Sequence, residues 1–229
     1  QARPAFSPME VKAALMNSTE PLEDLTSQRY QTSIVGSGRV AVERAVEQLI
    51  TAGADVAGGE IGVAFGSVVS DTKTTVERSV TLTNHATSEA VLDATVLPTH
   101  TLPGVTVSVA PTSVKVAAGQ SATVTVALSL DSLALGSPGP DPGTAAIVSQ
   151  QARHYLNEAS GNVRFVHSGG GGQDVLVPYQ GSVRAGANRR GIAPKNCGPG
   201  VESTVKVALD GDSAHPEPVV TAFQLGALD

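Results

Sequence analysis

The spacing of hydrophobic residues changes near residue 60 of this 229-residue chain. Before that point, apolar positions recur every three or four residues, which is the period of an amphipathic helix. After it, apolar and polar residues alternate, which is the period of a strand with one buried face and one wet face. The sequence therefore predicts a short helical segment followed by a mainly β structure.

The first predicted helix spans residues 8–17. Ser7 can cap its N-terminus, and Glu10 can reach back to the Ser7 amide. Pro8 fits the first helical position, where no amide donor is needed. The apolar stripe of this helix, which must pack on something larger, would consist of Val11, Ala14 and Leu15.

A second helix is predicted from residue 42 onward, with Gly53 as its C-cap. Residues 18–35, between the two helices, are polar and irregular. Gly36 and Gly38 precede the second helix, but a third glycine and a buried strand before them are missing, so no phosphate-binding loop is predicted. The apolar positions of this helix are Val42, Ala45, Val46, Leu49 and Ile50.

Turn residues separate the alternating stretches, and strands follow one another about every 8 to 12 residues, which indicates a β-sandwich. The glycine run Gly169–Gly172 would form the hairpin tip between the last two strands of the sandwich. The expected strands lie at residues 61–65, 76–82, 90–97, 105–109, 114–116, 122–130, 162–167 and 174–184.

A further helix, lying over one end or edge of the sandwich, is expected behind the Pro/Gly loop Pro138–Pro142. Beyond the sandwich, Ala187–Gly200 is expected to be a linker. Thr204–Leu209 and Val219–Leu225 are then expected to be strands of a further β-domain. The apolar residues that indicate the helix are Val148, Ala152, Tyr155, Leu156 and Ala159.

Composition narrows the classes of function. The net charge of -6 argues against a nucleic-acid binder, which needs a basic surface. Aromatic residues make up 3% and tryptophan is absent, so the core is expected to rest on Val, Leu, Ile and Ala. No apolar run approaches the ~20 residues of a membrane span. We find no signal peptide, and we expect the chain to be part of a larger protein.

Side chains that could carry chemistry are scattered along the sequence. Cys197 is the single cysteine, so it supports no disulfide framework or zinc site, and its Gly/Pro-rich surroundings argue against a catalytic thiol. Asp210, Asp212 and Glu217 are close in sequence, but the Ca²⁺ loop with its final Glu is missing, so we predict a polar turn. Asn17 begins an Asn-Ser-Thr glycosylation pattern. Each histidine is expected to be solvated or structural: His85, His100, His154, His167 and His215.

No catalytic, cofactor-binding or metal-binding residue is therefore predicted. A Ser-His-Asp triad needs a nucleophile, a base that activates it and an acid that orients the base. None of the five histidines stands in a motif that supplies such partners.

Two ordered motifs of the N-terminal segment are similar to the end of the catalytic domain of subtilisin-like serine proteases, the subtilases. The first is the phrase QARPAFSPMEVKAALMNSTEPL, and the second is GSGRVAVERAV. In the family, the first motif opens the surface helix after the one that bears the nucleophilic serine, and the second runs from a short strand into a last helix. The motif positions are filled by Pro4, Phe6, Ser7, Pro8, Glu10, Val11, Lys12 and Leu15, and by Gly36, Gly38, Val40, Ala45 and Val46.

One position departs from the family pattern. Ala41 stands where subtilases have Asp or Asn, a residue that would cap the following helix, so the start of that helix is less secure here.

The middle of the chain resembles the fibronectin type III-like domain that follows the catalytic domain in large extracellular subtilases. The phrases that carry this resemblance are GVTVSVAPTSVKVAAGQSATVTVAL at Gly104–Leu128 and SGNVRFVHSGGGGQDVLVPYQGSVR at Ser160–Arg184. The resemblance implies a mainly β fold: a fibronectin type III/Ig-like β-sandwich with an inserted or peripheral helix, preceded by a short helical remnant of an α/β subtilase domain. The implied division is 1–58 for the remnant, 59–186 for the sandwich, and 187–229 for a linker and the start of a further β-domain.

The resemblance implies that the whole protein is a secreted or cell-surface serine endopeptidase, and that this chain is its non-catalytic C-terminal portion. The subtilase signatures D-[ST]-G, H-G-T and G-T-S-M are absent from the chain, so the chain alone is predicted to be inactive. The implied partners are the upstream catalytic domain of the same protein and a protein or peptide substrate. The alternative is a cell-surface binding or adhesion module built of Ig-like sandwiches, which fits the Val/Thr-rich strands and negative charge equally well.

Overall fold

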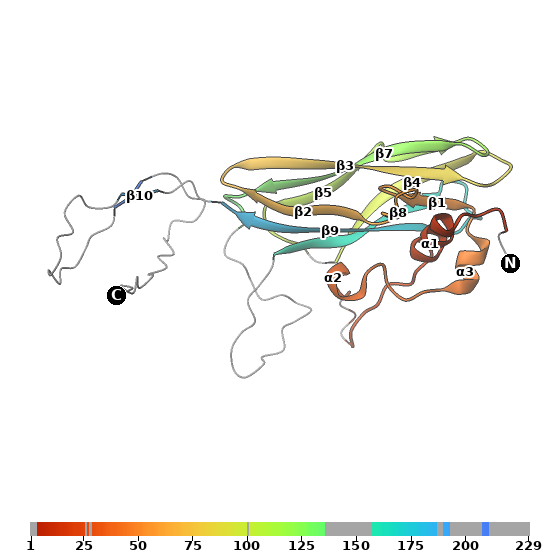
Figure 1. The fold of residues 1–229 in the computed structure, drawn as a ribbon, viewed down its shortest axis with the longest axis horizontal. Helices are drawn as coiled ribbons and strands as arrows, with labels where there is room; N and C mark the ends of the chain where they lie inside the picture. The colour runs from red at the N-terminus through yellow and green to blue at the C-terminus, as the bar shows by residue number, and fades with distance from the viewer. Residues whose placement is uncertain are drawn as a thin grey trace, which may run out of the picture.

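The computed structural model describes residues 4–25, 27, 29–99, 101–135 and 157–186, together with the backbone of two short strands at 190–192 and 208–210. The N-terminal segment forms three short helices, which lie beside a long β-sandwich (Figure 1). The helices are α1 (Pro8–Asn17), α2 (Thr32–Val35) and α3 (Val42–Glu47).

The sandwich consists of two sheets, and the chain passes from one sheet to the other at almost every step. The four-stranded sheet has the order β1 (Ile50–Gly53), β3 (Lys73–Asn84), β7 (Ser121–Asp131) and β5 (Val105–Ala110). The five-stranded sheet has the order β2 (Val63–Ser70), β9 (Val175–Ala185), β8 (Glu158–His167), β4 (Ala90–Pro98) and β6 (Ser113–Val116).

All neighbouring strands of the sandwich are antiparallel except β2 and β9, which run parallel. Alternation sets the buried face of each strand: on β7 the side chains of Val124, Val126, Leu128 and Leu130 point inward, and their neighbours are more exposed. The architecture confirms the predicted Ig-like β-sandwich.

The core lies between the two sheets and is built largely from Val and Leu, as the composition predicts. Three aromatic residues also belong to this core. Phe165 and Tyr179 are among its largest fully buried side chains, and Phe65 is buried with them. Burial of such aliphatic and aromatic surface supplies the main driving force for folding.

The prediction of the second helix is wrong for the second half of its range. Helix α3 ends at Glu47, and Ile50–Gly53 forms β1, which pairs with the end of β3. Gly53 is therefore the last residue of a strand and not a helix C-cap. The apolar residues at 49 and 50 continue the helical period by coincidence, because pairing with a distant strand overrides local spacing.

Two further predictions need correction. Of the predicted stripe of α1, Ala14 is buried as expected, but Val11 is 42% exposed, and the buried face also includes Ala13 and Asn17. Ala159, expected at the end of a helix, lies in strand β8. The other residues of that predicted helix fall outside the described part of the chain.

The C-terminal region is described only at two short strands. Strand β10 (Arg190–Ile192) pairs antiparallel with β11 (Ala208–Asp210). Arg190–Ile192 thus interrupts the stretch that we expected to be entirely linker, whereas Ala208 and Leu209 fall within an expected strand. The expected strand Val219–Leu225 lies outside the described residues.

The region around residue 58 is a tight turn. Asp55 and Glu60 exchange two backbone hydrogen bonds, and the Gly58 amide donates to Asp55 Oδ1 at 2.9 Å. This turn joins β1 of one sheet to β2 of the other. The boundary predicted at residue 58 stays a prediction, but residues 50–53 already take part in the sandwich.

Candidate functional site at the junction of helix and sandwich

Helix α1 begins with a complete capping box. The Glu10 amide donates to Ser7 Oγ at 3.2 Å, and the Ser7 amide donates to Glu10 Oε2 at 2.6 Å. Two amides that the first helical turn leaves free are thereby satisfied. The predicted start of this helix is confirmed.

Asn17, at the end of α1, joins the helix to both sheets. Its side chain is fully buried, and its Nδ2 donates to the Ala52 carbonyl of β1 at 3.0 Å and to the Leu176 carbonyl of β9 at 2.9 Å. The Ala52 amide in turn donates to Asn17 Oδ1 at 2.8 Å. The carboxamide therefore pairs with Ala52 as a neighbouring strand would, and it covers an otherwise open sheet edge.

Because Asn17 is buried, glycosylation at this residue is excluded in the folded chain. Both polar atoms of its amide are used in hydrogen bonds to the backbone of β1 and β9. A glycan on Nδ2 would need a solvent-exposed site. The Asn-Ser-Thr pattern therefore contains a structural residue, Asn17, and its two partner strands lie far from it in sequence.

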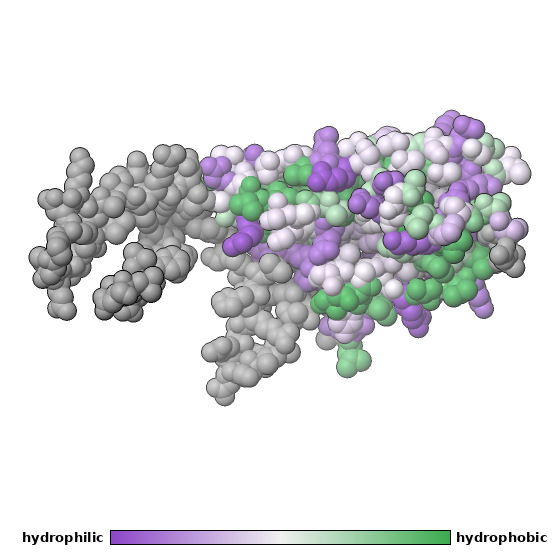
Figure 2. Space-filling model, in the orientation of Figure 1, coloured by the Kyte–Doolittle hydropathy of each residue, from purple (hydrophilic) through white to green (hydrophobic). Residues whose placement is uncertain are grey.

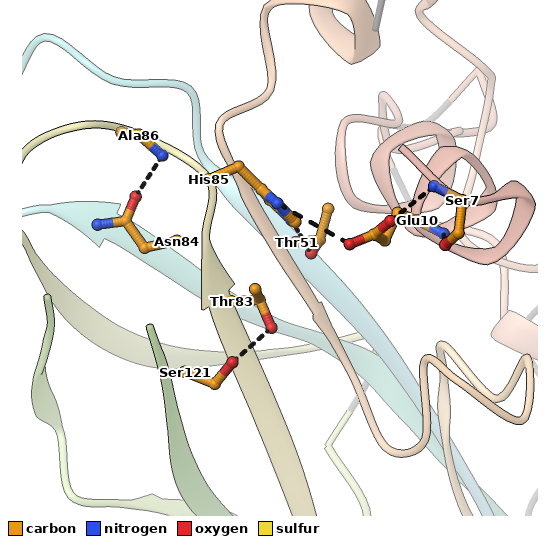
Figure 3. Close-up of polar contacts among 8 residues, drawn as sticks. All are labelled: Ser7, Glu10, Thr51, Thr83, Asn84, His85, Ala86 and Ser121. Atoms are coloured by element: carbon orange, nitrogen blue, oxygen red, sulfur yellow. Dashed lines mark hydrogen bonds and ion pairs between the residues drawn. The ribbon is translucent and has the colours of Figure 1, made fainter. Parts of the chain in front are cut away.

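His85 forms a second connection between α1 and the sandwich (Figure 3). Its ring lies just after β3, with Nε2 2.8 Å from Thr51 Oγ1 and Nδ1 3.9 Å from Glu10 Oε1. The Phe6 ring packs against it, with ring centroids 4.5 Å apart. Residues from α1, β1 and the end of β3 therefore meet around one imidazole.

The row Thr51–His85–Glu10 has the order of a nucleophile, a base and an acid, but it lacks an accessible nucleophile. Thr51 is only 1% exposed, so its hydroxyl is almost completely shielded from a substrate carbonyl. The arrangement can instead orient the imidazole and tie the helix to the sheet. The pKa of Glu10 lies below its ordinary value, mainly because the Ser7 amide and hydroxyl hydrogen-bond its carboxylate, with a smaller contribution from His85.

Helices α2 and α3 are attached by polar contacts of their own. The Ser33 amide donates to Glu158 Oε1 at 3.1 Å, and the Ser33 hydroxyl donates to Glu158 Oε2, which joins α2 to the start of β8. On α3, Arg44 donates to the Gln173 side chain at 3.3 Å, and Gln173 donates to Glu47 at 3.0 Å.

The outer surface of the N-terminal segment is unusually apolar. Among the described residues, all but two of the large hydrophobic side chains that are exposed lie before residue 50. Figure 2 shows green surface over the region of α2 and α3, on the side of the molecule away from β3 and β7. The members of this set are Met9, Val11, Leu22, Leu25, Tyr30, Ile34, Val40, Val42, Val46 and Leu49.

The residues that the sequence singled out do not come together. His167 ends β8 and lines a cavity of about 540 Å³ with Glu47, Glu89 and the glycine run, which forms the predicted turn. Asp210 ends β11, where only the backbone is described. His100, His154, His215, Cys197, Asp212 and Glu217 lie outside the described residues.

The described residues contain neither a metal-binding cluster nor a membrane-spanning helix. No group of three or more His, Cys, Asp or Glu side chains in this part of the chain could hold a metal ion. No helix in the same part is long and apolar enough to cross a membrane.

No family model and no curated protein matches the chain. Similar solved structures include the ASH/PapD-like domain of human CEP192, with a TM-score of 0.35 and 10% identity over 61% of this chain and 86% of that one. WR4, a C. elegans MSP family member, has a TM-score of 0.32 and 9% identity over 59% and 99% of the two chains. The secreted serine protease VesC from Vibrio cholerae has a TM-score of 0.31 and 12% identity over 56% and 22%. Likeness at this level carries no functional argument.

Proposed function

We propose that this chain is the non-catalytic C-terminal portion of a secreted subtilisin-like serine endopeptidase. In this proposal, the N-terminal segment, predicted as residues 1–58, completes the catalytic α/β domain, and the sandwich holds that domain in place or helps to recruit a protein substrate. The observation that supports the proposal is that the two motifs of the resemblance, in order, form a capped helix and a bridged extended residue followed by a short helix.

The first motif supports the proposal through its helix. Ser7, Pro8 and Glu10 form the expected cap of α1, and the helix continues to Asn17. A capped amphipathic helix alone is common to many folds, so the second motif is needed for the argument.

The second motif supports the proposal through a short extended piece that leads into a helix. Arg39 forms an antiparallel bridge with Glu20, and α3 follows at Val42. Gly38 has φ +121° at the bridge, and a Cβ there would lie 2.4 Å from the Glu20 carbonyl oxygen, so glycine is required. The departure at Ala41 has the consequence expected of it, since no side chain caps the start of α3.

The junction described above gives the sandwich its part in the proposal. The motif-bearing segment is connected to both sheets by the hydrogen bonds of Asn17, the contact of Glu10 with His85 and the hydrogen bond from the Ser33 amide to Glu158. A domain that ended in this segment would be held rigidly by the sandwich, and would not hang from it on a flexible linker. Such a support is a function that needs no catalytic residue in this chain.

An activity-based probe on the longer protein tests the proposal. The full gene product is treated with a fluorophosphonate that reacts with activated serines, and the labelled residue is mapped by mass spectrometry. We expect one labelled serine within G-T-S-M-[AS]-x-P upstream of this chain, and no label on the 229-residue chain alone. A full gene product with no labelled serine would contradict the proposal, and tight binding of the chain to a surface polymer or protein would then favour the adhesion module.

A further inference from the structure

A slot with a volume of about 260 Å³ opens between the two sheets, beside the connection from β4 to β5. Val105 and Val107 of β5 line this β4–β5 slot, together with Val96 of β4 and Leu102 of the connection. All four side chains pack against the core but are only partly buried. The β7 residues that pair with Val105 and Val107 are, in contrast, fully buried. The described residues therefore leave the core without full cover at the slot.

Tyr179 of β9 adds a polar group to the β4–β5 slot, which it also lines. Only 2% of this residue is exposed, and its hydroxyl has no hydrogen-bond partner among the described residues. Burial alone raises the pKa of its phenol. Since a buried tyrosine hydroxyl usually has a hydrogen-bond partner, the slot combines an apolar wall with a polar atom that can bind a further group.

The chain leaves and re-enters the described part of the structure at this slot. It leaves at Leu135, which is buried against Gly104: a Cβ on that glycine would lie 2.8 Å from the Leu135 amide nitrogen. Gly104 directly precedes Val105. The chain returns at Asn157, two residues before Ala159, which lines the slot. Residues 136–156, which lie outside the described residues, are therefore tethered beside the slot at both of their ends.

Two large side chains stand directly before the return. Consecutive Cα atoms are 3.8 Å apart, so the Cα atoms of Tyr155 and Leu156 lie at most about 15 and 11 Å from that of Ala159. Both side chains are thus within reach of the slot. A cavity of about 150 Å³ holds a benzene ring, so the slot has room for an aromatic or aliphatic side chain.

We propose that Tyr155 and Leu156 pack into the β4–β5 slot against Val105 and Val107, and that a main-chain carbonyl of the same segment accepts a hydrogen bond from Tyr179. The segment 136–156 is then a part of the core and not an outer loop. A tethered segment has an effective concentration of the order of mM at such a site, which favours it over a second copy of the chain or a separate peptide. This inference does not depend on the proposed function.

Nuclear Overhauser contacts in the unsubstituted 229-residue chain provide the direct test. We expect contacts between the Tyr155 ring and the methyl groups of Val105 and Val107, and we expect them to keep their intensity relative to core contacts when the protein is diluted. The absence of these contacts would overturn the inference. Contacts that weaken on dilution, together with a dimer in sedimentation, would also overturn it, because a second copy would then fill the slot.

Stability provides a second test through Leu156→Ser and Leu133→Ser. Leu133 is 72% exposed and follows β7, so it is a matched control at a position without cover. We expect Leu156→Ser to lower the melting midpoint by roughly 5 °C or more, because it replaces a buried aliphatic side chain by a polar one, and Leu133→Ser to leave the midpoint unchanged. Leu156→Met, which keeps an apolar side chain, should retain most of the midpoint. Equal midpoints for the two serine variants would overturn the inference.

Discussion

At the residue scale, Asn17 takes the place of a neighbouring strand for β1. We expect Asn17→Ala to lower the free energy of unfolding by about 2 to 4 kcal/mol, because it leaves the Ala52 amide and two buried carbonyls without partners. Urea denaturation measures the loss. Lys12→Ala is the control on the same helix: it removes an exposed hydrogen bond to the Gly59 carbonyl and should cost about 0.5 kcal/mol or less. Equal losses for the two variants would contradict the bridging role.

The stability that Glu10 contributes to the junction depends on pH. Its pKa in the folded chain lies below the ordinary value of 4.5, so its contribution is complete above pH 4.5 and is lost as the pH falls through the folded pKa. We expect Glu10→Gln to destabilise the chain by about 1 kcal/mol at pH 7, and we expect the gap to the unsubstituted chain to narrow below pH 4.5.

Denaturation curves at pH 7 and pH 3 measure this gap. Glu43→Gln, in the first turn of α3, is the matched control and should change stability little at either pH. A gap for Glu10→Gln that stays constant from pH 7 to pH 3 would contradict the assignment of the acid dependence to the capping box.

Single residues of the junction were predicted only where their partners are local. The cap of Ser7 and Glu10 follows from a spacing of three residues, and the sequence predicts it correctly. The partners of Asn17 lie 35 and 159 residues away, and Glu10 meets His85, which lies beyond three helices and three strands in the chain order. No local pattern encodes such pairs, so the sequence predicts only a solvated or structural role for His85, without its contacts, and shows Asn17 only as a glycosylation pattern.

At the element scale, the bridge before α3 depends on two glycines that differ in their surroundings. Gly36 has φ +61° with open space around its Cα, whereas a Cβ on Gly38 would meet the Glu20 backbone. We expect Gly36→Ala to cost about 1 kcal/mol, and Gly38→Ala clearly more, since a steric clash adds to the strained φ. Thermal unfolding of the two variants measures the difference. Equal costs would mean that the bridge between Glu20 and Arg39 contributes little.

Elements were predictable where a long stretch repeats one period. The eleven residues of β7 alternate without interruption, and this strand appears where expected. The end of α3 was not predictable, because residues 42–50 satisfy the helical period throughout. What ends the helix is the pairing of Ile50 with Asn84 on β3, a contact between residues far apart in sequence. The exposure of Val42 and Val46 likewise depends on which side of α3 faces the sandwich, and the helical period does not encode that side.

At the scale of the whole molecule, the N-terminal segment and the sandwich share a sheet and buried hydrogen bonds. Strand β1 lies in the four-stranded sheet, and α1 covers the edge where β1 and β9 lie near each other (Figure 1). We therefore expect the amides of β1 and of the last turn of α1 to exchange at the slow rate of β3 and β7, in a single cooperative opening. Native-state hydrogen exchange at increasing denaturant measures these rates.

A chain that begins at residue 54 provides the control for this cooperativity. It lacks α1 and β1, so the edge of β3 that pairs with β1 and the Leu176 carbonyl both lose their hydrogen-bond partners. The buried side chains of Leu82 and Val80 also lose the neighbouring strand β1. Because unpaired edges and newly exposed aliphatic surface both favour association, the shortened chain should unfold at lower denaturant and aggregate on concentration. If it instead unfolds at the same denaturant concentration as the longer chain, and if α1 exchanges as an independent protected unit, the segment and the sandwich are separate bodies. The rigid support that the proposed function requires would then have no physical basis.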